Sequence, residues 1–177
     1  MKNKRVYRLA VYAALLGMLL GNFGLTGCAA YHLGSNLPPG ITSVCVPTFV
    51  NQTSEPGLEF ETTNATVEEM QLDGTLRVAP REQASSLLEV RLTHYALTPL
   101  RYRKDQTTTA REYRLTITAK VTLRKLPSNE VVVKETTVIG FASFDAPADL
   151  PSARRNALPA TARNLAHQIV KTVVEYW

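Results

Sequence analysis

A cysteine near the start of the chain stands in a pattern that prepares it for covalent modification. Leu25, Thr26 and Gly27 precede Cys28, and the two small residues before the cysteine leave the backbone open to a peptidase. In such a pattern, which looks like a lipobox, the thiol receives a diacylglycerol, the chain is cut before the cysteine, and the new amine is acylated. We therefore expect N-acyl and S-diacylglycerol lipid on Cys28 and no other cofactor.

The segment before Cys28 has the organisation of a secretory signal peptide. Basic residues are confined to its first part, and residues 9–20 form an apolar stretch. About a dozen apolar residues are too few to span a bilayer, which takes about 20. A basic segment, a short apolar segment and small residues at the cleavage point together indicate export. We predict that residues 1–27 are removed and that Cys28 begins the mature protein.

The residues after Cys28 predict a lipid-anchored tether. Residues 28–40 are rich in turn formers and end in Pro38, Pro39 and Gly40. Several acyl chains hold a protein stably on a membrane where one chain would be marginal. Ala29 follows the cysteine, and lipoproteins of this type without Asp at that position usually travel on to the outer membrane. The expected location is therefore the outer membrane, with the lipid anchor on the periplasmic side.

A group of basic residues surrounds the middle of the chain, where a hairpin is expected. The guanidinium group of arginine pairs bidentately with phosphate oxygens, so one interpretation is an anion-binding patch. The other is the solvated face of a hairpin, with some residues pairing with acidic groups of a partner. The candidate patch consists of Arg101, Arg103, Lys104, Arg111 and Arg114.

Net charge gives little support for nucleic-acid binding. The 177-residue chain has a formal charge of +5, but four of its basic residues lie in the predicted signal peptide, so the mature chain carries about +1. The composition, 45% hydrophobic and 20% charged, suits one ordinary globular domain. Nucleic acid is not an expected partner.

Residues that often carry catalysis or bind metals are dispersed. His32, His94 and His167 lie far apart, without metal-ligand spacing, and Cys45 stands alone in an apolar run that favours a buried core position. Nucleophile-elbow, P-loop and dinucleotide motifs are absent from the sequence. We expect neither a metal site nor an enzyme. The glutamates of the first predicted helix suit a solvated face: Glu59, Glu61, Glu68 and Glu69.

Hydrophobic alternation predicts the strands. From Tyr113 to Leu123 every odd position is apolar and every intervening even position is polar, which indicates one buried and one solvated sheet face. Residues 87–97 alternate too, but the phase shifts by one residue at His94, which predicts a bulge or bend. Further strands are expected at residues 41–50, 76–80 and 131–141.

Two helices complete the predicted fold. The first runs from about Pro56 to Leu72, with Leu58, Ala65 and Leu72 on one face. The second runs from about Ser152 to Tyr176, and Pro159 should kink it or delay its regular part by a turn. The order predicts an α+β two-layer sandwich, with two helices packed on one face of a four- to five-stranded, mostly antiparallel sheet. A single αβ domain is expected over residues 41–177. Its helical stripe consists of Leu158, Ala162, Leu165, Ile169, Val173 and Tyr176.

Several short stretches follow one another in a recognisable order. They are residues 31–34 directly after the lipid cysteine, then Val44–Thr53, Glu55–Glu59, Asp73–Val78, Leu88–Tyr102 and Leu165–Val170. As an ordered set they resemble the lipopolysaccharide-assembly lipoprotein family LptE, over nearly all of the mature chain. No single stretch is diagnostic, but the ordered set is a much stronger indication than any one stretch.

The resemblance implies a non-enzymatic role. A lipoprotein of this family sits in the lumen of the outer-membrane β-barrel LptD, helps it to assemble, plugs it, and assists lipopolysaccharide on its way to the surface. The five-residue basic patch would then meet the phosphates of lipid A. An alternative from another class is a periplasm-facing envelope lipoprotein that binds a different partner, such as a peptidoglycan synthase.

Overall fold

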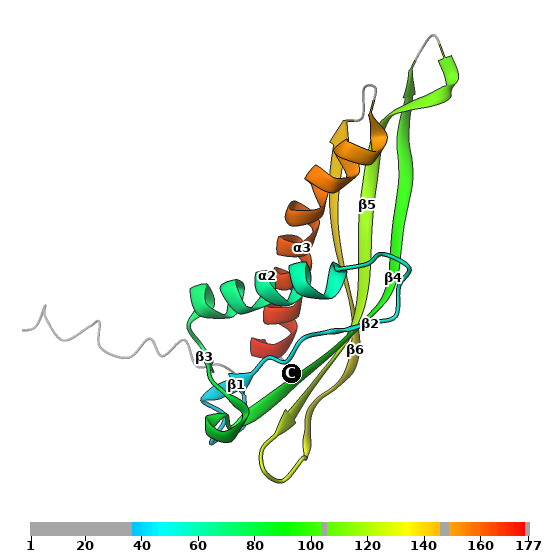
Figure 1. Cartoon of the computed structure of the whole chain (residues 1–177). Coiled ribbons are helices and arrows are strands. Elements are labelled where there is room, and N and C mark those ends of the chain that lie inside the picture. Colours follow the sequence, from blue (N-terminus) through cyan, green and yellow to red (C-terminus); the bar gives the residue numbers. More distant parts are fainter. Residues whose placement is uncertain (1–36, 104–105, 146–148, 176–177) are drawn as a thin grey trace, which may run out of the picture. The chain divides into compact units, whose positions relative to one another are not determined.

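The computed structural model describes residues 37–103, 106–145 and 149–175, and for Arg103 and residues 106–109 it describes the backbone alone. The predicted signal peptide, Cys28, His32 and Lys104 lie outside the described residues. The elements in Figure 1 are β1 (Ser43–Cys45), β2 (Val50–Asn51), α2 (Leu58–Asp73), β3 (Arg77–Val78), the 3-10 helix η2 (Arg81–Gln83), β4 (Ser86–Arg103), β5 (Gln106–Lys125), β6 (Val131–Asp145) and α3 (Leu150–Val174).

The strands form one mixed sheet with the order β3-β1-β4-β5-β6, and β2 also pairs with β4. The long strands β4, β5 and β6 form an antiparallel meander, as the alternation predicted. At the other edge, β1 and β2 run parallel to β4, and β3 runs parallel to β1. The predicted α+β sandwich is confirmed, with a sheet of six strands.

The sheet has one strand more than expected because residues 41–50 do not form a continuous strand. They yield β1 and the start of β2, which pair with successive parts of β4 through Val44–Ser86 and Val50–Arg91. Pro47 lies in the break, where its missing N–H cannot serve a sheet ladder. Cys45 was expected to be buried but is only partly so, because its neighbour Val44 takes the fully buried position.

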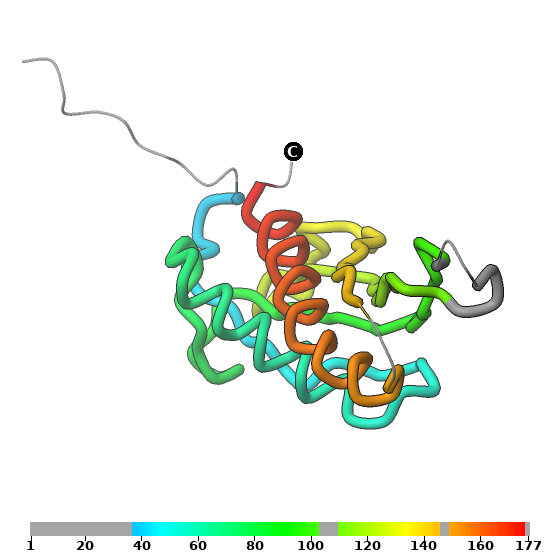
Figure 2. The backbone as a smooth tube through the Cα atoms, turned by 90° about the horizontal axis from the view of Figure 1, so that it is seen from above, coloured from blue at the N-terminus to red at the C-terminus, as the bar shows by residue number. Residues whose placement is uncertain are grey.

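Both helices cover the same face of the sheet, as Figures 1 and 2 show. The core between the layers includes Leu88, Leu92 and Ile117 from the sheet and Leu165 and Ile169 from α3. The two helices contact each other through a small cluster of Ala65, Ala162 and Ala166. Small side chains at this point allow the two helices to approach closely.

The buried face of α2 agrees with the prediction at Leu58 and Ala65 but not at Leu72, which is 82% exposed. Its other buried residues are Thr62, Thr63, Thr66 and Met70. Thr62 and Thr66 donate their hydroxyl hydrogens to the carbonyls four residues earlier, at 2.8 Å each. Because these hydroxyls are satisfied within the helix, the threonines can be buried at little cost.

The predicted bulge in β4 is present. Leu92 pairs with Ala119 and His94 with Thr118, so Thr93 is an extra residue on β4. Before the bulge, the buried residues that face the helices have even numbers. After the bulge, the partly buried Tyr95 faces the helices at an odd-numbered position. The bulge therefore keeps apolar side chains facing the helices along a strand of 18 residues.

The helix α3 starts earlier than predicted. The side chain of Asp149 accepts a hydrogen bond from the backbone N–H of Ser152 at 3.3 Å and caps the helix at Leu150. Hydrogen bonds from Ser152 also hold the pKa of Asp149 below its usual value. Pro159 lies inside the helix and does not delay it. Of the predicted stripe, Tyr176 lies outside the described residues, Leu158 is partly buried, and Ala162, Leu165, Ile169 and Val173 are buried.

Candidate functional site

The outer part of the β4–β5 hairpin carries the predicted basic patch and extends beyond the helices (Figure 1). Arg101 is register partner of Glu112, and its Nε lies 3.2 Å from Glu112 Oε2. The Arg101 side chain is nevertheless 80% exposed. An exposed ion pair of this kind contributes little to stability, so Arg101 remains accessible to an anionic ligand.

Arg114 lies on the same side of the hairpin. Its guanidinium carbon is 4.8 Å from the centre of the Phe141 ring, in a cation–π contact with β6. Side chains alternate along β5, so Glu112 and Arg114 share the sheet face turned away from the helices, while Arg111 belongs to the opposite face. The predicted patch is therefore divided between two faces. Arg103's side chain and Lys104 lie outside the described residues.

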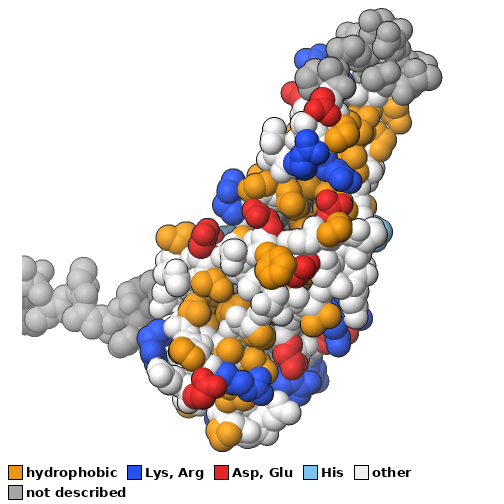
Figure 3. Space-filling model, viewed as in Figure 1, with side chains coloured by type: hydrophobic (Ala, Val, Ile, Leu, Met, Phe, Trp, Pro, Cys, Tyr) orange, Lys and Arg blue, Asp and Glu red, His pale blue; other side chains and the backbone are white. Residues whose placement is uncertain are grey.

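Aromatic and aliphatic side chains accompany these arginines. Leu100 and Tyr102 are exposed on β4, and Tyr113 stacks on Phe144 with ring centres 6.1 Å apart. Figure 3 shows hydrophobic side chains along the part of the hairpin beyond the helices, with Lys and Arg side chains near them. Such a mixed surface suits an amphipathic, negatively charged ligand. The sequence prediction considered only the basic residues and missed the aromatic ones. The position of the aromatic residues at the ends of the strands could have indicated them.

A second polar feature lies on the sheet face turned away from the helices. A groove of about 610 Å³, here called the sheet groove, crosses β4, β5 and β6 beside the segment between β1 and β2. Its charged lining comprises five basic and two acidic side chains: Arg81, Arg91, Lys120, Arg124, Lys134, Glu89 and Glu135. Sequence analysis did not predict this groove.

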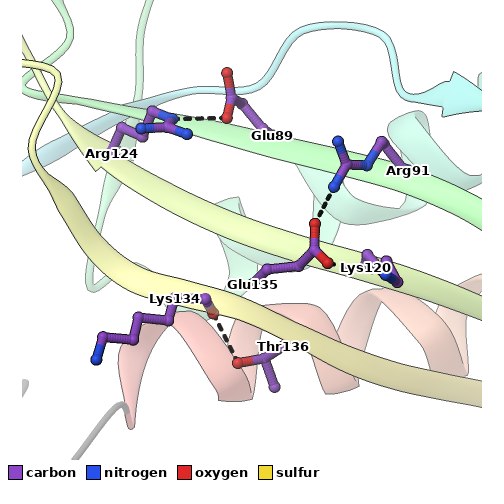
Figure 4. Close-up of polar contacts among 7 residues, drawn as sticks. All are labelled: Glu89, Arg91, Lys120, Arg124, Lys134, Glu135 and Thr136. Atoms are coloured by element: carbon purple, nitrogen blue, oxygen red, sulfur yellow. Dashed lines mark hydrogen bonds and ion pairs between the residues drawn. The ribbon is translucent and has the colours of Figure 1, made fainter.

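Ion pairs organise the lining of the sheet groove (Figure 4). Glu135 of β6 contacts both Arg91 of β4 and Lys120 of β5, with 2.9 Å between its Oε1 and Lys120 Nζ. Arg124 Nε lies 2.9 Å from Glu89 Oε2. The hydrogen bond from Lys120, together with the nearby positive charges, holds the pKa of Glu135 below its usual value.

Two further titratable side chains among the described residues, Tyr95 and His167, have charged neighbours. Burial is the main reason why the pKa of Tyr95 is raised, and Glu55 adds to the shift while Arg154 opposes it. His167 Nδ1 lies 2.9 Å from Glu69 Oε1 on the helix surface. Within residues 37–103, 106–145 and 149–175, no group of three or more His, Cys, Asp or Glu side chains could hold a metal ion.

Of the four glutamates expected on a solvated face, Glu68 is exposed, whereas the other three are partly buried. Glu59 accepts a hydrogen bond of 2.7 Å from the Asn51 amide. It thereby ties α2 to the end of β2. None of the helices in the described part of the chain is both long and apolar enough to cross a membrane.

The fold defines a domain of the α+β sandwich class. The chain matches the family model LptE, described as lipopolysaccharide-assembly, over residues 41–173. It therefore belongs to the LptE family, a family of non-enzymatic lipoproteins with a role in lipopolysaccharide assembly. The resemblance noted in the sequence is confirmed.

Solved structures share this fold at low sequence identity. A hypothetical protein from Chlamydia trachomatis has a TM-score of 0.55 at 9% identity, covering 76% of this chain and 96% of that one. A protein from Xanthomonas campestris has a TM-score of 0.56 at 11% identity, covering 78% of this chain and 87% of that one. The comparison with curated proteins found no match.

Proposed function

We propose that this protein is an outer-membrane lipoprotein, anchored by acyl chains on Cys28, that associates with and plugs an LptD-type β-barrel. In this role it assists the assembly of the barrel and the insertion of lipopolysaccharide at the cell surface. Membership of the LptE family is the observation that carries the proposal. The signal peptide at residues 1–27 and the tether at residues 28–40 belong to the same proposal.

The geometry of the folded domain supports an interaction role. Its helices bury one face of the sheet, and the other face carries exposed charged and apolar side chains, among them Arg114, Ile139 and Phe141. The hairpin end adds Arg101 and Tyr102. These side chains suit contact with a protein wall or with the phosphates and acyl chains of lipopolysaccharide.

The test of the barrel partnership is affinity purification of the full chain, tagged at its C-terminus, from detergent-solubilised envelopes. We expect a large β-barrel protein in near-equal amount in the mass spectrum of the eluate. Elution of a peptidoglycan synthase without a barrel would support the alternative of a periplasm-facing lipoprotein with another partner. In that case the plug role would be abandoned.

Direct lipopolysaccharide binding is tested on the two arginines that share a face. Charge reversal in Arg101→Glu with Arg114→Glu should reduce the retention of the protein on immobilised lipopolysaccharide about tenfold or more. Arg163→Glu with Lys171→Glu on α3 is a control of the same charge change. Equal losses in both variants would indicate an effect of net charge alone, and no loss in the hairpin variant would exclude this part of the patch from lipopolysaccharide binding.

A further inference from the structure

The sheet groove contains more positive charge than its own carboxylates neutralise. Arg91 and Lys120 are direct register partners on β4 and β5, an arrangement of like charges that is unfavourable across a strand pair. Glu135 enters between them from β6 and bridges both. Arg124 is paired with Glu89. Two carboxylates, those of Glu135 and Glu89, therefore already pair with three of the five basic side chains.

Two basic side chains of the lining have no such partner. Arg81 of η2 and Lys134 of β6 are exposed, and neither forms an ion pair with any residue that the structure describes. They belong to opposite margins of the groove, because η2 leads into β4, and β5 separates β4 from β6. Two strand spacings amount to about 10 Å. A small anion bound at one margin would leave the basic side chain at the other margin without a partner.

The groove also presents apolar surface between its charges. Val50 is 54% exposed and Val131 is 43% exposed, and both line the groove together with Leu87. An occupant with carboxylates alone would leave these side chains in water. An extended peptide advances about 3.3 Å per residue and turns successive side chains to opposite sides, so it can supply separated carboxylates and apolar groups together.

We propose that the sheet groove binds an acidic, extended peptide segment of a partner protein. Carboxylates of that segment pair with Arg81 and Lys134, and its apolar side chains lie on Val50 and Val131. The charge complementarity of the groove identifies this chemistry. The groove is separate from the arginines of the hairpin end, and its occupancy does not depend on whether the barrel is the partner.

The test uses the folded protein and a short fluorescein-labelled peptide in which glutamate and valine take turns at every second position, with serine between them, so that both residue types face the groove. Binding is followed by fluorescence anisotropy. Arg81→Glu combined with Lys134→Glu should weaken binding about tenfold or more. Arg163→Glu with Lys171→Glu carries the same charge change on the helix side and should bind like the parent protein. If the charge-reversed protein does not fold, the milder double variant Arg81→Gln with Lys134→Gln replaces it in the binding measurement.

Four results would overturn the proposal. The first is absence of peptide binding by the parent protein, and the second is equal binding by the groove variant and the parent. The third is displacement of the peptide by phosphatidylglycerol vesicles whose own binding depends on Arg81 and Lys134, because the groove would then be a site for lipid headgroups. A peptide with lysine in place of glutamate should not bind, and binding of that peptide would also contradict the proposal.

Discussion

Leu165 of α3 lies directly against Gly140 of β6, with no room for a side chain between the two backbones. A Cβ atom on Gly140 would lie 2.5 Å from the Cα, the Cβ and the backbone nitrogen of Leu165. The helix therefore meets the edge of the sheet at a point that only glycine allows. Leu165 is fully buried there, so this contact fixes the distance between the two layers.

Replacing Gly140 by alanine should destabilise the domain. The clash involves backbone atoms of a helix, so either α3 or β6 must move, and overpacking of this kind costs about 1–3 kcal/mol or more. Urea denaturation measures the free energy of unfolding. Ser143→Ala, an exposed change on the same strand, should have almost no effect, and a Gly140→Ala protein as stable as the parent would show that the layers can separate without cost.

The side chain of Asn164 protects the free edge of β6 beside the same contact. The backbone N–H of Phe141 donates to Asn164 Oδ1 at 3.0 Å instead of pairing with a strand. Asn164→Ala should leave this amide open to water and speed its hydrogen exchange about tenfold, which NMR can measure at residue 141. Asn164→Asp keeps an acceptor oxygen and should restore most of the protection. Equal exchange in all three proteins would mean that α3 covers the edge without help from this side chain.

A buried hydrogen bond links the segment after β1 to α2. The backbone N–H of Phe49 donates to Thr63 Oγ1 at 3.0 Å, and that hydroxyl in turn donates to the carbonyl of Glu59 at 2.6 Å. Thr63→Val keeps the shape but leaves the Phe49 amide without an acceptor, which should cost about 1–3 kcal/mol of stability. Thr63→Ser preserves the hydroxyl and should lose less. Chemical denaturation measures the free energy of unfolding of both variants. A valine variant at least as stable as the serine variant would contradict this prediction.

Glu135 should make stability depend on pH in the acid range. Its pKa in the folded state lies below the ordinary value of 4.5, chiefly through the hydrogen bond from Lys120. A lowered pKa means that the ionised group stabilises the fold above the ordinary pKa and that this contribution is lost as pH falls through the folded-state pKa. The difference in Tm between the parent and Glu135→Gln should therefore be largest near neutral pH and should shrink in acid.

The control for this pH dependence is Glu130→Gln. Glu130 lies exposed in the turn between β5 and β6 and has no ion pair among the described residues. Its variant should follow the parent at every pH. A Glu135→Gln protein that also follows the parent from neutral to acid pH would show that the bridge to Arg91 and Lys120 does not stabilise the fold.

Sequence reasoning succeeded where a periodic pattern was long. The alternation from Tyr113 to Leu123 predicted a one-sided strand, and the phase shift at His94 predicted the bulge. It failed at the parallel edge of the sheet because β1, β2 and β3 have only two or three residues each, too few to show a period. It also placed Leu72 on the buried face of α2 and missed the threonines there, since a threonine such as Thr62 is polar yet can be buried once its hydroxyl is hydrogen-bonded.

The sheet groove was beyond prediction for a different reason. Arg91, Lys120 and Glu135 come from three strands and converge only through the pairing register of β4 with β5 and β5 with β6. Register depends on turn geometry and on bulges, which a single sequence does not specify. The sequence predicted the residues of the hairpin patch as one group. Only the structure indicates that they are divided between two faces of the hairpin.

The parallel pairing of β1 and β2 has a consequence for the order in which this chain can be assembled. Residues 43–45 are synthesised first, yet their partners are residues 77–78 and 86–87, and β2 waits for residues 91–92. Until those residues have been synthesised, Val44 and Phe49 cannot be buried between a sheet and the helices. β5 and β6, by contrast, each follow their antiparallel partner directly in the sequence. The first strands of the nascent domain therefore stay unpaired while α2 is synthesised, and exposed unpaired strands are prone to aggregation.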